Sequence, residues 1–277
     1  MPNLVKSLMV SLVVLIATIL FIVIVQKQHQ EEPDYPKVFI SLDDLYVAPL
    51  ESSQEPVPNF ISHTDVTEKK RAFFSYLLPE IRRQNRIVEK EREMVFSLLQ
   101  VHSDNKQFNQ HELAAFEMLK QKYKLNTAKY VTVESTLGQL IIRVDTIPEQ
   151  LILVQAANES GWGTSRFAVQ GYNFFGLWCF KQGCGFVPKQ RNDDATHEVA
   201  KFSDLSHSIM TYIRNLNRLY AYEELRQIRL HLRKTNKPVT AKALSKGLMS
   251  YSERGQDYID ELLSMLRVNE KYMEVTL

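Results

Sequence analysis

The sequence has few of the residues and motifs on which several classes of enzyme depend. Only 2 of its 277 residues are cysteine, and two thiols alone make a poor zinc site. It also lacks the H-E-x-x-H helix of zinc proteases, the glycine loop that cradles nucleotide phosphates and the G-x-S-x-G turn of serine hydrolases. The sequence therefore implies no metal and no cofactor.

An excess of positive charge is missing as well. Lys6 and Lys27 are the only charged residues among the first 30, so 32 of the 34 basic residues remain in the body of the chain, against 32 acidic ones. Nucleic-acid binding is built on an excess of Lys and Arg, so this balance argues against a nucleic-acid partner. The composition, 44% apolar and 24% charged, fits one medium globular domain with additions.

The longest stretch without charge is residues 7–25, which is long enough to cross a bilayer as a helix. It has no Ala-x-Ala-like exit, which favours an uncleaved signal anchor over a cleaved signal peptide. Lys6 precedes the stretch, and Glu31 and Glu32 follow it closely, which favours a cytoplasmic amino terminus. We therefore expect residues 1–30 to be a cytoplasmic tip and single-pass anchor in a bacterial inner membrane, with the body in the periplasm.

The next part of the chain divides into a linker and a helical region. Residues 31–66 contain five prolines and no sustained period, which is typical of a linker. Residues 67–135 show helical spacing that starts near Thr67, with Asp65 or Thr67 as the cap and a new start or kink at Pro79. A further helix is predicted over residues 110–123, where Leu113, Phe116, Leu119 and Tyr123 form an apolar stripe.

A buried helix is predicted to end in an acid. Asp145 or Thr146 can cap its start, Pro148 suits its first turn, and four consecutive aliphatic residues at 151–154 leave no face for water. Glu159 lies close to its end, and Gly161 can adopt the left-handed conformation that stops it.

Burial and the negative end of the helix dipole both raise the pKa of the Glu159 carboxyl, which favours a group that is protonated near neutrality. Such a group can act as the general acid of glycoside hydrolysis. The alternative is that Glu159 only satisfies backbone groups at a helix end.

The segments "AANESGWGTSRFA" at 156–168 and "NFFGLW" at 173–178 resemble the catalytic motifs of bacterial glucosaminidase-type peptidoglycan hydrolases. The likeness extends through residues 199–217 and 248–266, and the segment 71–85 after an anchor is similar to the Bax-type branch of that family. It implies a mainly α (α+β) fold, with a lysozyme-like helical core from about 67 to 277 and a small β lobe near 170–202. Residues 136–277 are expected to form the glucosaminidase-like catalytic domain.

The resemblance also implies roles for individual residues. Glu159 matches the catalytic acid, and Glu198 matches a second carboxylate better than Asp193 or Asp194 does, with a structural glutamate on a surface strand as the alternative. Tyr251 matches a tyrosine near the acid, although the family often continues Y-A-T-D where this chain has Tyr251 followed by Ser-Glu-Arg. Contacts with the sugar are expected from Trp162, Asn173, Phe175 and Trp178, with core packing as the alternative for the aromatic side chains. Tyr258 is expected in the core of the last helix.

The cysteines, Cys179 and Cys184, have four residues between them. In an oxidising periplasm this spacing favours a disulfide that pins a short hairpin. His197 is the one histidine that lies next to a candidate catalytic residue, Glu198, although a lone histidine is more often structural.

Three functions follow. The preferred one is a membrane-anchored hydrolase that cleaves the β-1,4 bond after N-acetylglucosamine in peptidoglycan or a related glycan. The alternatives are a lytic transglycosylase of the same fold, which needs only one Glu, and a non-catalytic cell-wall-binding protein. Protein partners stay open.

Overall fold

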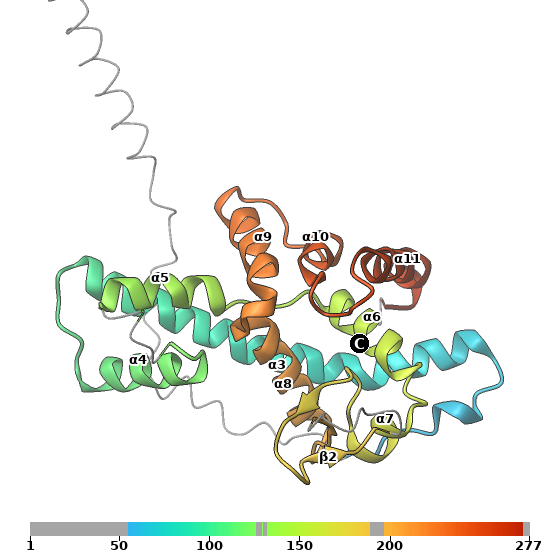
Figure 1. Cartoon of the computed structure of the whole chain (residues 1–277). Helices are drawn as coiled ribbons and strands as arrows, with labels where there is room; N and C mark the ends of the chain where they lie inside the picture. The colour runs from blue at the N-terminus through green and yellow to red at the C-terminus, as the bar shows by residue number, and fades with distance from the viewer. Residues whose placement is uncertain (1–54, 126–128, 130–131, 189–196, 274–277) are drawn as a thin grey trace, which may run out of the picture. The chain divides into compact units, whose positions relative to one another are not determined.

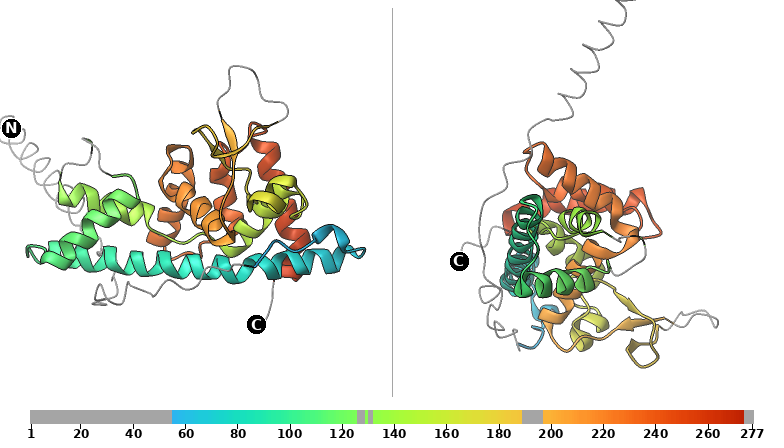
Figure 2. Two further views of the ribbon diagram at one scale, coloured as in Figure 1. Left: turned by 90° about the horizontal axis from the view of Figure 1, so that it is seen from below. Right: turned by 90° about the vertical axis from the view of Figure 1, so that its left-hand side faces the viewer.

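One long helix, α3 (Val66–Ser103), runs along one side of the fold, and most other helices pack on it (Figures 1 and 2). The computed structural model describes residues 55–125, 129, 132–188 and 197–273. Asp65 caps α3 as predicted, because its carboxylate accepts a hydrogen bond of 2.8 Å from the backbone N–H of Glu68.

Helix α3 passes through Pro79 without a break, so the prediction of a new helix start there is wrong. Proline removes one backbone hydrogen bond, but the apolar stripe on either side of it is continuous and buried. Phe74, Leu77 and Ile81 are each 0% exposed. The burial of these side chains against the core outweighs the lost bond.

The helices α4 (Gln110–Lys122) and α5 (Val133–Arg143) lie side by side at the far end of α3 (Figure 1). The predicted helix over 110–123 is confirmed, with Phe116, Leu119 and Tyr123 buried. Leu113 was expected on the same stripe but is 50% exposed, because the buried face of this helix is narrow. The sequence pattern did not predict α5.

The buried helix of the sequence prediction is α6 (Glu149–Ser160), which packs on α3, α10 and α11. Every residue from 151 to 157 is buried, as the lack of a polar face predicts. Gly161 ends the helix with φ of 57°, as expected.

The predicted cap of α6 is wrong. Pro148 is the N-cap residue and no side chain caps the helix. The carboxylate of Asp145 instead lies among the guanidinium groups of Arg92, Arg229 and Arg233, with its closest approach to Arg233 at 2.9 Å. These charges hold the pKa of Asp145 below its usual range although burial opposes them.

The small β lobe follows α7 (Arg166–Gly171). Its strands are β1 (Trp178–Cys179), β2 (Gly185–Phe186) and β3 (Glu198–Ala200), antiparallel in the order β1-β3-β2. Trp178 pairs with Val199, and Gly185 pairs with Ala200. The lobe lies within residues 170–202, as predicted.

The remaining helices return to the core after the lobe. They are α8 (Leu205–Arg218), η2 (Tyr220–Tyr222), α9 (Glu223–Lys234), α10 (Ala241–Ser245), η3 (Lys246–Leu248) and α11 (Gln256–Met273). The described chain is thus mainly helical with one small sheet, as expected. The lysozyme-like architecture stays an inference from the resemblance.

The described chain begins inside the segment expected to be a linker. Its short helix η1 (Phe60–Ser62) packs on α3, and Phe60 is 1% exposed with its ring centroid 5.4 Å from that of Phe73. The predicted anchor at 1–30 and residues 31–54 lie outside the described residues. Among the helices of the described ranges, none combines the length and the apolarity that a bilayer crossing requires.

Candidate active site

Glu159 lies in the last turn of α6, half-buried, at the end of the most buried helix of the fold. Burial raises the pKa of its carboxyl group, which is the direction predicted from the sequence. A hydrogen bond from Tyr258 acts in the opposite direction, and the negative charge of Glu261 raises the pKa again. Two smaller effects lower the pKa: the positive charge of Arg254 and a hydrogen bond from the side chain of Asn158.

A chain of buried hydrogen bonds orients the acid. The hydroxyl of Tyr212 donates to Gln155 Oε1, and Gln155 Nε2 donates to the hydroxyl of Tyr258 at 2.9 Å. The proton of Tyr258 is then free to point at Glu159, with which it forms a hydrogen bond. Because each step fixes the direction of the next, the acid is held from α8 and α11 as well as from its own helix.

Two further tyrosines complete the surroundings of the acid. The ring of Tyr251 stacks on that of Tyr258, with centroids 5.6 Å apart and an interplanar angle of 4°. The ring centroid of Tyr222 lies 5.9 Å from that of Tyr251. Burial and the charge of Glu159 raise the pKa of Tyr222 to about 12. Burial also raises the pKa of Tyr251 well above its usual value. Both phenols therefore stay neutral, and the proton of Tyr251 is donated to the backbone carbonyl of Phe175 at 2.8 Å.

The loop that follows α7 brings a glycine to the acid. A Cβ atom built on Gly176 would lie 3.6 Å from Glu159 Oε2, so the backbone approaches this carboxylate oxygen closely. Gly176 has φ of 62°, which favours glycine at this position. A side chain there would occupy the space next to the oxygen.

The side-chain amide of Asn173 holds this loop through hydrogen bonds of both its nitrogen and its oxygen. Its Nδ2 donates to the carbonyl groups of Leu177 and Ala200, both at 2.9 Å, and its Oδ1 accepts from the backbone of Phe175 and Leu177. The side chain is 1% exposed. These bonds use both hydrogens of the Asn173 amide and give the side chain a structural role, while its contact with substrate stays a prediction.

Of two aromatic residues expected at the sugar, Phe175 lies in the core and Trp162 is partly buried against it. Phe175 is 1% exposed and stacks on Tyr212 at 4.0 Å, while its carbonyl accepts a hydrogen bond of 2.8 Å from Tyr251. Trp162 packs between Phe73 and Phe74 at centroid distances of 5.7 and 5.4 Å. For both residues the observed packing favours the core role that was the alternative to sugar binding.

Trp178 differs from the other aromatic candidates because it is 58% exposed. Its ring stacks on that of His197, with centroids 4.0 Å apart and an interplanar angle of 14°. An exposed indole held flat on the β lobe can pack against the apolar face of a sugar. Its contact with substrate stays a prediction.

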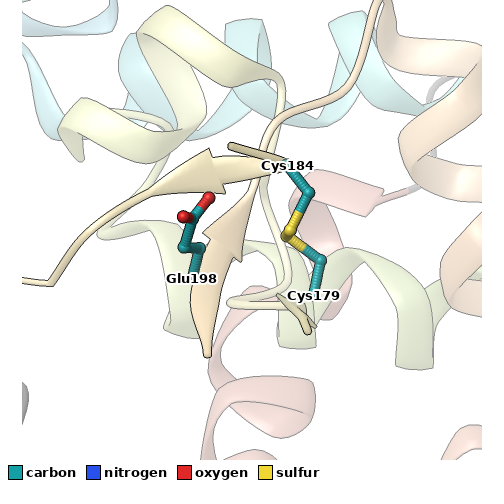
Figure 3. A group of neighbouring side chains, drawn as sticks. All are labelled: Cys179, Cys184 and Glu198. Atoms are coloured by element: carbon teal, nitrogen blue, oxygen red, sulfur yellow. A yellow bond between two sulfur atoms is a disulfide. The ribbon is translucent and has the colours of Figure 1, made fainter. Parts of the chain in front are cut away.

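Glu198 holds the loop between the two cysteines (Figure 3). Its carboxylate accepts hydrogen bonds from the backbone N–H groups of Gly183 at 2.9 Å and Gly185 at 2.7 Å, and the residue is 5% exposed. These bonds support a structural role, while the predicted role as a second catalytic carboxylate stays a prediction.

The predicted disulfide between Cys179 and Cys184 is confirmed, with a Cα–Cα distance of 6.2 Å. The two sulfur atoms and a Glu198 oxygen lie within 4.8 Å of one another. Because the sulfurs are bonded to each other, they offer no thiolate to a metal ion.

Sequence reasoning missed two residues of the site. Tyr258 is buried in the core as expected, but its hydroxyl also contacts the acid. Gln155 is 0% exposed in an otherwise apolar run. A buried amide needs partners, so this lone polar residue was the signal that could have indicated a hydrogen-bonded network.

A half-buried carboxyl group whose pKa is raised by burial suits the general acid of glycoside hydrolysis. The profile of the glucosaminidase family, described as Mannosyl-glycoprotein endo-beta-N-acetylglucosaminidase, matches residues 136–271. Protein bax of Escherichia coli (strain K12) is 31% identical over 215 residues, which are 78% of this chain and 75% of that protein. The chain therefore belongs to the glucosaminidase family as a Bax-type member. No solved structure matches it.

Proposed function

We propose that this protein is a membrane-anchored glycoside hydrolase that cleaves the β-1,4 bond after N-acetylglucosamine in peptidoglycan or a related glycan. The observation that carries the proposal is the carboxyl group of Glu159, whose pKa is raised by burial and whose orientation is fixed by Tyr258. The family match supports a glycan substrate. The anchor rests on the uncharged stretch at residues 7–25.

Glu159 acts as the general acid in this proposal. Its proton passes to the glycosidic oxygen as the bond to the sugar carbon breaks. The carboxylate that remains is stabilised by the hydrogen bonds from Tyr258 and Asn158. Gly176 keeps the space beside Oε2 clear for the leaving sugar.

A second group must stabilise the positive charge that develops on the sugar. Glu198 would have to give up its bonds to Gly183 and Gly185 to do so. The acetamido group of N-acetylglucosamine needs no such rearrangement, and the phenol of Tyr222 can donate a hydrogen bond that orients it, whereas the proton of Tyr251 is donated to Phe175. We therefore favour the acetamido group as an internal nucleophile, which retains the configuration of the sugar.

The test is digestion of purified peptidoglycan by the full chain in detergent, beside Glu159→Gln, with mass spectrometry of the released ends. We expect reducing N-acetylglucosamine ends that the variant releases about 10²- to 10⁴-fold more slowly. Anhydro ends would indicate a lytic transglycosylase instead. Binding to peptidoglycan without release of fragments between pH 4 and 8 would indicate a non-catalytic wall-binding protein.

A further inference from the structure

A pocket with a volume of about 420 Å³ opens beside the last turn of α6. Its walls come from α6, α11 and the first turns of α3, and its lining includes Lys70, Asn158, Trp162, Glu261, Ser264 and Asn269. Two of these residues also act on the catalytic acid, since Asn158 donates a hydrogen bond to Glu159 and the charge of Glu261 raises its pKa. The pocket therefore adjoins the site of the proposed reaction.

Lys70, which lines this pocket, belongs to a group of three cations that lie around two aromatic rings. Lys70 Nζ lies 5.1 Å from the ring centre of Trp162 and 5.5 Å from that of Tyr272. The guanidinium of Arg71 and the ammonium of Lys271 lie 5.8 and 5.0 Å from the same Tyr272 ring.

None of these three cations forms an ion pair with an acid in the part of the chain that the structure describes. The one acid that lines the pocket, Glu261, is paired with Arg254 at 2.7 Å. The rings hold the cations near the pocket without neutralising them, so the pocket favours a negatively charged ligand.

The lining can also form hydrogen bonds with a peptide backbone. Ser264 and Asn158 bring a hydroxyl and an amide to the pocket. Asn269 is 2% exposed, and its Nδ2 donates to the carbonyl of Met265 at 2.8 Å. Its Oδ1 is buried and has no hydrogen-bond partner among the described residues.

We propose that this pocket binds a short acidic peptide carried by the glycan on a sugar next to the cleaved bond. Lys70 pairs with a carboxylate of the peptide, Trp162 supports its apolar part, and Ser264 bonds to its backbone. The inference rests on the proposed function, because it is the glycan in the active site that brings the peptide to the pocket. Binding of the peptide places the scissile bond at Glu159 and selects glycans that carry such peptides.

The test compares two substrates, peptidoglycan strands with their peptides and the same strands after an amidase has removed them. For Lys70→Ala in the full chain, we expect the KM for peptide-bearing strands to rise about tenfold relative to that for bare strands, because a charge-assisted hydrogen bond is lost. Lys69→Ala changes the neighbouring lysine of α3 and is the matched control. An equal change of KM on both substrates would overturn the proposal.

A binding measurement separates this inference from the proposed reaction. Isothermal titration of Glu159→Gln with a free acidic tetrapeptide of the cell wall should show binding that the double variant Glu159→Gln/Lys70→Ala loses. If the wild-type protein cleaves neither substrate but this binding is seen, the proposed function fails and the pocket assignment stands. Absence of peptide binding, or Lys70-dependent binding to anionic lipid vesicles in its place, would overturn it.

Discussion

The hydroxyl of Tyr258 donates a hydrogen bond to the carboxylate of Glu159, from α11 to the last turn of α6. The bond stabilises the ionised form of the acid, whereas burial destabilises it, and burial is the larger effect. The acid is thus held in one orientation while its pKa stays raised. This combination lets a carboxyl group keep its proton until a glycosidic oxygen receives it.

Replacing Tyr258 should move the pH dependence of the reaction. In Tyr258→Phe the hydrogen bond that lowers the pKa of Glu159 is lost, so the pKa rises further and the alkaline limb of the kcat profile moves to higher pH. We also expect kcat at the optimum to fall about tenfold, because the acid is no longer oriented. Tyr220→Phe, at a residue that is 86% exposed, is the control. A reduced kcat with an unmoved alkaline limb would show that Tyr258 acts through packing alone.

Glu159 should also make stability depend on pH. Its pKa is raised on folding, so the folded state binds its proton more tightly than the unfolded state does, and stability is lost as the pH rises through the folded pKa. Glu159→Gln removes this loss. The gain in melting temperature of Glu159→Gln over wild type should therefore grow between pH 5 and pH 8, as measured by differential scanning fluorimetry. The exposed Glu253→Gln should show no such growth.

Glu198→Gln separates a structural from a catalytic carboxylate. The N–H groups of Gly183 and Gly185 each bond to a different oxygen of the Glu198 carboxylate, whereas an amide offers only one oxygen. We therefore expect a loss of about 1 to 3 kcal/mol of stability in urea unfolding. The kcat of the folded variant should stay within about twofold of wild type, since removal of a general acid or base costs about 10²-fold or more. A hundredfold fall in kcat with the lobe intact would restore Glu198 as the second catalytic group.

The Asp145 cluster should contribute strongly to stability. Arg229 is 1% exposed beside Asp145, so Asp145→Asn leaves a buried guanidinium without its counter-charge. We expect a loss of about 3 to 5 kcal/mol in urea unfolding at pH 7. Because the pKa of Asp145 is lowered on folding, this contribution is present above its unfolded pKa and is lost as the pH falls through the folded value. Asp104→Asn, at a partly exposed pair with Lys106, should change stability by less than about 1 kcal/mol.

Trp178→Ala tests the exposed indole of the β lobe. If Trp178 packs on a sugar ring, its removal should raise the KM for peptidoglycan about tenfold and leave kcat nearly unchanged, because the stacking acts on the bound sugar rather than on the reacting bond. Phe180→Ala removes a neighbouring aromatic side chain that is 75% exposed and is the matched control. Equal effects of the two substitutions would argue against a specific sugar contact.

The predictions that succeeded rest on short segments of sequence. Asp65 and Gly161 mark helix ends because capping and the left-handed conformation involve neighbouring residues. The disulfide follows from two cysteines close together in the chain. The predicted new helix start at Pro79 is wrong. A rule about neighbouring residues does not take into account the buried apolar stripe that continues on both sides of the proline.

By itself the sequence determined the buried helix α6, the acid at its end and the direction in which the pKa of that acid is shifted, because these follow from apolar periodicity and neighbouring residues. Only the tertiary structure decided which groups face the acid and which polar candidates are already bonded to the backbone. Tyr258 contacts Glu159 from the last helix, while the side chains of Asn173 and Glu198 form hydrogen bonds with the backbone of the β lobe. A sequence pattern records the type of a side chain, but its hydrogen-bond partners are set by the packing of segments that are distant in the chain.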